Sequence, residues 1–290
     1  MGFASELDTY WAELSPMRAR LVVRCLAEPG ETVSGYVSGP ECLLAATLPV
    51  KLPLQVRAGG DVTAAEALVT DLCYWTPELP LVYRVHLERR RANGKSVVSE
   101  RLVGARAFHT QGPNLYVEGK RRVLRGAADE HVQTDCAEAW HKSELVRLVD
   151  DPGDELCDEL SRQGVLVVAR VREEPWAEAL PRLAQHAAVA MAVLAGDDLP
   201  AAEVRRAARQ MLLAQEFRLG ERVESSPWAH MTFCHVDDPA NFIEWARDDG
   251  LPLIAYRPLA ALVSLAAARA ACDKLQASLP LLGRYAGYIV

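Results

Sequence analysis

The sequence predicts an antiparallel β-sandwich followed by a parallel β/α domain. Residues 18–110 contain short runs in which polar and apolar residues alternate, separated by Gly and Pro, as in strands with one buried face. Residues 111–290 instead alternate continuous apolar runs with helical patterns, as in sheets covered by helices. The length of 290 residues suits about two domains. We therefore expect an N-terminal segment over 1–17, the sandwich over 18–110 and the β/α domain over 111–290.

The predicted sandwich is a series of short strands. Residues 18–37, 41–60 and 79–108 hold short β-rich runs, and a Pro-Gly pair separates two of them within the first stretch. The stretch at 92–95, which contains an Asn-Gly pair, is a hairpin turn signal between two alternating strands. Several strands at this spacing over about 100 residues are typical of an immunoglobulin-like sandwich.

The predicted β/α domain alternates buried strands with helices, which implies right-handed βαβ units and a parallel sheet. Residues 201–220 have helical spacing and are expected to form one long amphipathic helix. About 170 residues is short for an eight-stranded barrel, which typically needs about 250, so a trimmed barrel and an open sheet both remain possible interpretations. The expected strands are seven: 121–127, 145–149, 165–171, 189–195, 229–236, 251–257 and 285–290.

Charge and hydropathy exclude several classes of partner. The formal net charge of −7 argues against a general nucleic-acid binder, which needs a basic face. No run approaches about 18 uninterrupted apolar residues, so no membrane span is expected. The N-terminus has neither the basic nor the apolar region of a signal peptide. We therefore expect a cytoplasmic protein that binds neither nucleic acid nor a membrane.

Cysteine and histidine usage gives no indication of a metal site. The seven cysteines include no CxxC pair, which indicates free thiols in a reducing compartment rather than disulfides or zinc ligands. His230 and His235 lie five residues apart in one predicted strand and should point to opposite faces, so we interpret them as single core or rim residues. Glycine-rich nucleotide-binding motifs are absent from the sequence. We expect no cofactor and no metal.

Residues 74–88 (YWTPELPLVYRVHLE) resemble a motif of glycoside hydrolase family 2, which includes β-galactosidases and β-glucuronidases, where Trp-x-Pro-Glu-x-Pro-x-x-Tyr leads into a sandwich strand. Residues 104–126 are similar to the family's next segment, in which a Gly-x-Arg-x-Phe strand passes through a hairpin into the first barrel strand. The resemblance covers about residues 70–290 and implies an immunoglobulin-like sandwich followed by a shortened TIM-type (β/α) barrel. Three later segments resemble barrel motifs in the family's order: 146–168, 186–198 and 251–258.

The resemblance also implies glycoside hydrolysis with retention, which uses one carboxylic acid as acid/base and a second as nucleophile. Counted from His186, the family's acid/base Glu falls on Asp197 and its preceding Asn on Gly196. A one-residue slip instead places Asp197 and Asp198 on the Asn and the Glu. Asp is one methylene shorter than Glu, and displacing a catalytic carboxyl by about 1 Å costs about 100-fold in rate. Asp197 and Asp198 are therefore the candidate catalytic acids.

The nucleophile position departs further from the family. Aligned on the penultimate strand, the nucleophilic Glu becomes Arg257, and a guanidinium cannot attack an anomeric carbon. Asp150 stands where the second-strand motif has a His, although Arg147 persists. Asp237 and Asp238 offer a replacement nucleophile only in a rebuilt geometry. We expect a degenerate cleft in which arginines pair with carboxylates or bind an anionic ligand; its candidates are Arg147, Asp150, Arg257 and Asp237.

Three functions remain open on these grounds. The first is a pseudoenzyme, a glycoside hydrolase without activity, whose cleft binds a carbohydrate, another small ligand or a protein partner. The second is an active retaining O-glycosyl hydrolase of carbohydrate metabolism, with a rebuilt carboxylate pair that includes Asp197 or Asp198. The third is a structural subunit that forms a homo-oligomer. Arg257 at the nucleophile position favours the first.

Overall fold

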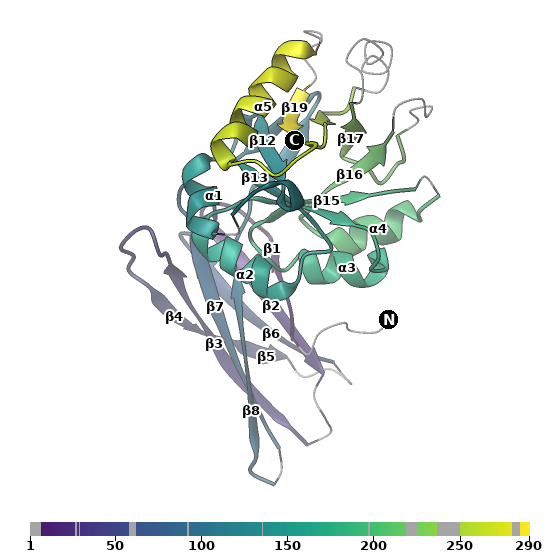
Figure 1. Ribbon diagram of the computed structural model, residues 1–290. Coiled ribbons are helices and arrows are strands. Elements are labelled where there is room, and N and C mark those ends of the chain that lie inside the picture. The colour runs from purple at the N-terminus through teal and green to yellow at the C-terminus, as the bar shows by residue number, and fades with distance from the viewer. Residues whose placement is uncertain are drawn as a thin grey trace. The chain divides into compact units, whose positions relative to one another are not determined.

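A computed structural model of the chain divides into two compact units (Figure 1). The first unit comprises Met1–Arg106 with Gln185–Ala187, and the second comprises Ala107–Ala184 with Ala188–Val290. The structure describes every residue except the following: 1–6, 27, 29, 58–61, 92, 135, 197, 219–224, 237–249 and 280–284.

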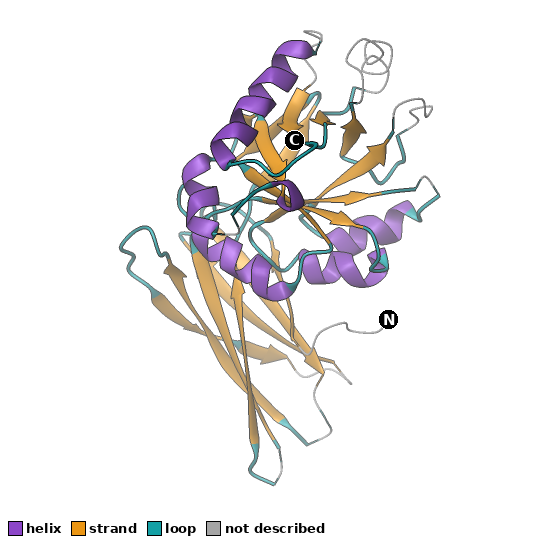
Figure 2. Ribbon diagram, in the orientation of Figure 1, coloured by secondary structure: helices purple, strands orange, loops and turns teal. Residues whose placement is uncertain are grey.

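The first unit is a sandwich of two antiparallel sheets, as the sequence predicts (Figure 2). One sheet has the order β1 (Leu7–Ala12), β2 (Arg18–Leu26), β6 (Val62–Thr70) and β5 (Gln55–Arg57). The other has the order β4 (Val50–Pro53), β3 (Thr32–Glu41), β7 (Val82–Arg90) and β8 (Ser96–Val103). The Asn-Gly pair lies between β7 and β8, which form an antiparallel hairpin. Strand β1 lies inside residues 1–17 and pairs with β2.

Alternation along the strands builds the core of the sandwich. In β7, Tyr83, Val85 and Leu87 are buried, while the intervening Arg84 and His86 are only partly buried. The buried residues of both sheets join in one apolar cluster. Alternation with a period of two places these side chains on the inner face of each sheet. Full burial of one such apolar side chain contributes about 1.5–3 kcal/mol, and this burial holds the two sheets together.

The second unit contains a closed barrel of eight parallel strands. Strand pairing runs around the barrel in chain order, and the last strand pairs with the first. The expectation of seven strands is therefore wrong, and the barrel closes instead of forming an open sheet. The strands are β12 (Leu124–Ala128), β13 (Val146–Asp150), β14 (Val167–Val171), β15 (Val189–Leu194), β16 (Leu212–Phe217), β17 (Met231–His235), β18 (Leu253–Tyr256) and β19 (Tyr285–Ile289).

The missing strand lies inside the segment 201–220, which was expected to be one helix. Helix α4 (Ala201–Ala208) ends at Arg209, whose φ of 54° is incompatible with a right-handed helix. Strand β16 then pairs with β15 and β17. Its residues Leu212, Leu213 and Ala214 also favour helices, so helical spacing alone was misleading; burial between two neighbouring strands decides their conformation.

Helices lie along the outside of the barrel strands (Figure 2). Helix α2 ends before Gly164, whose φ of 72° provides a left-handed C-cap. Helix α5 begins at Ser264, whose hydroxyl accepts a hydrogen bond from the backbone N–H of Ala267. None of the described helices is long and apolar enough to cross a membrane. Besides α4, the described helices are α1 (Ala137–Ser143), α2 (Asp154–Gln163), α3 (Trp176–Leu183) and α5 (Leu265–Ser278).

Smaller elements precede and follow the first barrel strand. A three-stranded antiparallel sheet precedes it, and a 3-10 turn, η1 (Asp129–His131), follows it directly. The turn brings charged residues to the carboxyl end of the barrel, where the strand ends converge. The sheet consists of β9 (Phe108–Gln111), β10 (Asn114–Val117) and β11 (Lys120–Arg122).

Closure of the barrel requires a glycine where β12 meets β13. A Cβ at Gly126 would lie 2.4 Å from Cγ2 of Val146 and 2.8 Å from its carbonyl oxygen. These two residues are direct partners in the pairing of the strands, so neither backbone can move without disturbing the barrel. Glycine is present because no side chain fits, not because of an unusual φ.

We predict that Gly126→Ala lowers the free energy of unfolding by about 1–3 kcal/mol, because the added methyl overpacks a strand junction. Urea unfolding followed by circular dichroism measures the loss. Gly153→Ser is the matched control, since a Cβ there meets nothing within 4 Å and Ser is a good N-cap for α2. Equal stability of Gly126→Ala and the native chain would contradict the packing that we describe.

Candidate functional site

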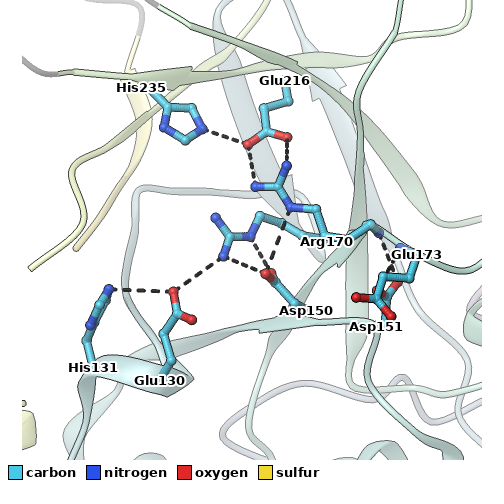
Figure 3. Close-up of polar contacts among 9 residues, drawn as sticks. Glu130, His131, Asp150, Asp151, Arg170, Glu173, Glu216 and His235 are labelled. Carbon is cyan, nitrogen blue, oxygen red and sulfur yellow. Dashed lines mark hydrogen bonds and ion pairs between the residues drawn. The ribbon is translucent and has the colours of Figure 1, made fainter.

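Charged side chains from neighbouring strands meet at the carboxyl rim of the barrel (Figure 3). Asp150 is the last residue of β13, and Arg170 lies near the end of β14. Glu216 and His235 lie at the ends of β16 and β17. In a parallel barrel all strands deliver their last residues to one rim, which is where catalytic and binding groups gather in such barrels. We call this group, together with Glu130, His131 and Arg172, the rim network.

Glu216 is the most buried carboxylate of the rim network, with a side chain that is 5% exposed. The guanidinium of Arg172 binds it through both terminal nitrogens: Nη1 is 2.9 Å from Oε2, and Nη2 is 3.0 Å from Oε1. Nε2 of His235 lies 2.6 Å from the same Oε1. Such bidentate, charge-assisted pairs are among the strongest hydrogen bonds that proteins make.

The surroundings of Glu216 keep it ionised. Burial is the largest single influence and raises the pKa of Glu216, but the hydrogen bond from His235 and the charges of Arg172, His235 and Arg170 together outweigh it. The net result is a pKa below the ordinary value of 4.5. Because an ionised carboxylate only accepts hydrogen bonds, Nε2 of His235 must carry a hydrogen. Glu216 therefore acts as an acceptor near neutral pH and has no proton to donate.

Asp150 holds Arg170, the arginine that lies within β14. Both its oxygens accept from Arg170, whose Nη2 is 2.9 Å from Oδ2 and whose Nε contacts Oδ1 closely. Nε of Arg172 is 3.9 Å from Oδ2 of Asp150, so this carboxylate lies between two guanidinium groups. Arg170 is only 7% exposed, and its guanidinium also lies 5.2 Å from the ring centre of Tyr256. Arg170 thus belongs to the barrel interior, unlike Arg172.

A third arginine–carboxylate pair, Arg147 with Asp129, lies beside the rim network. Both Nε and Nη2 of Arg147 contact Oδ1 of Asp129, at 2.7 and 2.6 Å. Arg147 is buried in β13, and its guanidinium lies 5.5 Å from the ring centre of Trp140. Asp129 comes from η1, directly after β12. Three arginine–carboxylate pairs between different elements have now been described: Arg172 with Glu216, Arg170 with Asp150 and Arg147 with Asp129.

Arg257 follows β18 and occupies the position where the resemblance places the nucleophile. Its Nε donates to the carbonyl oxygen of Val236 at 3.1 Å. Its Nη2 is buried and has no hydrogen-bond acceptor within the described part of the chain. Burying an N–H donor without an acceptor costs free energy.

The predicted site residues are placed in different ways. Arg147 and Asp150 lie at the rim, but they pair with Asp129 and Arg170 rather than with each other. Asp198 is solvent-exposed after β15. Asp197 and Asp237, with Asp238, lie outside the described residues, so their position relative to the rim network stays a prediction.

The central residues of the rim network were not identified from the sequence. A helix over 201–220, as the sequence predicts, gives the side chain of Glu216 no direction toward the rim. His235 was interpreted as a single core or rim histidine, whereas its ring is paired with Glu216. Arg170 and Arg172 were visible as two charges at the end of a buried apolar run, and that departure from apolar character was the available signal.

The arrangement suits charge neutralisation better than acid–base chemistry. Retaining glycoside hydrolysis needs a protonated carboxyl and an ionised one about 5–5.5 Å apart. Glu216, Asp150 and Asp129 each hold a guanidinium instead. Within the described residues, no group of three His, Cys, Asp or Glu side chains is arranged to hold a metal ion.

We predict that Glu216→Gln lowers the free energy of unfolding by about 2–3 kcal/mol at pH 7. Removing one partner of a buried pair typically costs 3–5 kcal/mol, and the 29% exposure of Arg172 reduces that cost because water reaches the remaining guanidinium. Urea unfolding of both proteins measures the difference. Glu138→Gln, in an exposed pair with Lys142, is the control and should change stability by less than about 0.5 kcal/mol.

The same two proteins should differ in their dependence on pH. Because the folded pKa of Glu216 lies below 4.5, the ionised group stabilises the fold above that value, and the contribution is lost as the pH falls through the folded pKa. The stability difference between the native chain and Glu216→Gln should therefore be constant from pH 7 to about 5 and then shrink. A difference that grows on acidification would show that the carboxyl is protonated in the fold.

No family model and no curated protein matches the sequence, but solved structures match the fold. The β-glucuronidase of Dictyoglomus thermophilum is 12% identical, with a TM-score of 0.71 over 98% of this chain and 61% of that one. A Bacteroides uniformis β-glucuronidase is 14% identical, with a TM-score of 0.67 over 98% of this chain and 45% of that one. The chain thus spans about half the length of these structures. It has the sandwich-and-barrel fold of glycoside hydrolase family 2.

Proposed function

We propose that this chain is a catalytically inactive relative of the family 2 glycoside hydrolases, whose barrel rim binds a small ligand such as a carbohydrate or supports assembly with a protein partner. One observation carries the proposal. The carboxylates of Asp129, Asp150 and Glu216, which the described strand ends and η1 bring to the rim, are each paired with an arginine. A carboxylate held in this way is neither a free nucleophile nor a proton donor.

The missing acid supports inactivity. A general acid must hold its proton near the working pH, so glycosidases raise the pKa of the acid by placing it in an apolar setting. Glu216 has the required burial, but His235 and Arg172 lower its pKa below the ordinary value. An active hydrolase would have to use Asp197 or Asp198 as acid, together with a nucleophile in place of Arg257.

The missing nucleophile supports both parts of the proposal. Arg257 is cationic where an oxocarbenium-like transition state requires a negative charge. Its buried Nη2, which has no acceptor in the described part of the chain, offers an N–H to an oxygen of a bound molecule. The change therefore removes the chemistry and adds a hydrogen-bond donor, which favours a binding role over an empty cleft.

Hydrolysis assays test the proposal. The similar structures are β-glucuronidases, so the panel of 4-nitrophenyl β-glycosides should include the β-glucuronide beside the galactoside and glucoside. We expect no release of nitrophenol above buffer from the native chain at pH 5 to 8. Turnover that falls about 100-fold in Asp197→Asn or Asp198→Asn would contradict the proposal, because loss of that size indicates a catalytic carboxyl.

Binding is measured on the same preparation. We expect a sugar or sugar acid that uses the donor of Arg257 to raise the melting temperature of the native chain, and the shift to disappear in Arg257→Ala. Light scattering tests assembly independently, since a self-associating subunit shows a mass that rises with concentration. A monomer that no sugar stabilises would contradict the small-ligand and self-assembly roles together.

A further inference from the structure

We propose that strand β8 is a self-association edge, which pairs antiparallel with the β8 of a second copy of this chain. The pairing joins the sheet β4-β3-β7-β8 of each copy into one continuous sheet across a two-fold axis. The inference goes beyond the proposed function, because it concerns the sandwich and holds whether or not the barrel rim binds a ligand.

Strand β8 lies at the edge of its sheet. It pairs with β7 along its whole length, from Ser96 opposite Arg90 to Val103 opposite Tyr83, and no other described strand pairs with it. The N–H and C=O groups of β8 that point away from β7 therefore face no strand of the described chain. Such a row of unpaired backbone groups is a template for a strand of another chain.

The side chains of β8 add apolar surface to this edge. Val97 and Val98 are 36% and 54% exposed, although β-branched residues favour strands because they pack against neighbouring strands there. Adjacent residues of a strand point to opposite faces, so the edge is apolar on both faces at this level. A second strand beside β8 would cover both valines.

The remaining edges of the sandwich are short, bounded by proline or buried. Strand β4 has four residues; Pro49 precedes it and Pro53 ends it, and proline cannot donate to a partner strand. Strand β5 has three residues, and most residues of β1 are buried. Strand β8 has eight residues and contains no proline. It is therefore the edge along which a second strand can pair most extensively.

Symmetry and charge select the register. Opposite residues of an antiparallel pair lie on the same face, so a two-fold axis through the sheet places one residue of β8 opposite itself. Glu100 or Arg101 at the axis brings like charges together, and Val98 at the axis places Lys95 opposite Arg101; such pairs are destabilising. A register centred before Val98 runs into the hairpin turn. Ser99 at the axis avoids these conflicts and lies near the middle of the strand.

The register centred on Ser99 places each charged residue of β8 opposite a valine. Glu100 lies opposite Val98 of the second copy, and Arg101 lies opposite Val97, so the aliphatic stems of the long side chains cover the exposed valines. Ser99 of the second copy lies diagonal to Arg101 on the same face. Its hydroxyl is an acceptor beside a guanidinium whose buried Nε has none within the described part of the chain.

The charge of Glu100 is compensated within its own sheet. Nδ1 of His86 lies 2.9 Å from Oε1 of Glu100, and Nη1 of Arg84 lies 3.6 Å from Oε2. Both partners belong to β7 and therefore remain in place when a second strand joins the other side of β8. The two copies of Glu100, which lie diagonally across the axis, thus approach each other as ion pairs and not as bare carboxylates.

The opposite edge of the sheet limits the assembly to two copies. In the joined sheet each outer edge is a β4 strand, which is short and bounded by Pro49 and Pro53. An isologous contact of this kind uses the same surface of both copies and leaves none for a third. The expected product is a closed dimer and not a filament.

Sedimentation equilibrium over about 1 to 200 µM protein measures the self-association. We expect a monomer–dimer equilibrium with a Kd of about 10–100 µM, as suits a small interface, and no larger species. A chain that stays monomeric at 200 µM, or whose mass grows beyond the dimer, overturns the proposal. Binding of sugars is read separately from melting temperatures, so a failure here leaves the proposal for the rim standing.

Two substitutions at Val98 test the register. Val98→Glu places a carboxylate opposite Glu100 of the second copy, twice in each dimer, and should raise the Kd about 10-fold. Val98→Lys places an ammonium there and should leave the Kd no more than about 3-fold above the native value. Glu88 lies opposite Val98 within the same chain, in monomer and dimer alike, so it does not alter the comparison. Equal effects of the two substitutions overturn the register.

Val50→Glu is the matched control. Val50 is 52% exposed and lies on β4, at the opposite edge of the same sheet. The same charge added there should leave the Kd unchanged, and circular dichroism checks that all three variants fold, as expected for substitutions at exposed positions. Loss of the dimer in Val50→Glu overturns the assignment of the interface to β8.

Hydrogen exchange locates the interface without any substitution. Backbone amides of β8 that point away from β7 should exchange about 3-fold more slowly at 200 µM than at 5 µM protein, because pairing in the dimer protects them. Amides of β4 should exchange at the same rate at both concentrations. A dimer in which β8 gains no protection overturns the proposal.

Discussion

Closure of the parallel barrel is the constraint on which the rest of the second unit depends. Once β19 pairs with β12, the carboxyl ends of all eight strands lie at one rim, and the residues there lie close together. The strands are buried along most of their length, and two charged side chains at their ends, Arg170 and Glu216, are only 7% and 5% exposed. Charges in such a place must be paired, because an unpaired buried charge costs several kcal/mol.

Alternation of charge around the rim follows from that constraint. Each carboxylate of the rim network contacts a guanidinium or an imidazole, and the guanidinium groups of Arg170 and Arg172 each contact two carboxylates. Such saturation stabilises ionised side chains. Catalysis of the retaining kind requires the opposite, two carboxyls whose surroundings drive their pKa values apart. The described part of the rim network is thus a chain of ion pairs. Its members, in order of contact, are His131, Glu130, Arg170, Asp150, Arg172, Glu216 and His235.

The sequence predicted the architecture well, because both units follow simple periods. Alternation with a period of two identified the sandwich strands, and continuous apolar runs identified seven of the barrel strands. Strand β16 was missed because Leu, Ala, Gln and Glu suit helices as well as strands when their neighbours are unknown. The spacing of the strands indicates the missing one. The first four barrel strands begin at Leu124, Val146, Val167 and Val189, about every 22 residues, and the gap between Val189 and Met231 is long enough for one more strand.

The error in one strand explains why the site was harder to predict than the fold. A helix over 201–220 gives Glu216 no fixed direction, so the partners of Arg172 and His235 could not be inferred. Which arginine meets which carboxylate depends on register between strands that are distant in sequence, and no local pattern encodes it.

Fold and rim chemistry rest on different residues, so one can change without the other. The barrel is held by buried apolar strands and by a close approach at Gly126, and none of these requires a catalytic acid. That separation fits a chain that shares a fold with β-glucuronidases at 11 to 14% identity. It also sets a condition on the rim. A buried arginine at these strand ends needs a carboxylate partner, and a buried carboxylate there needs a cation. Arg172 and Glu216 satisfy this condition for each other, since their side chains form a close ion pair.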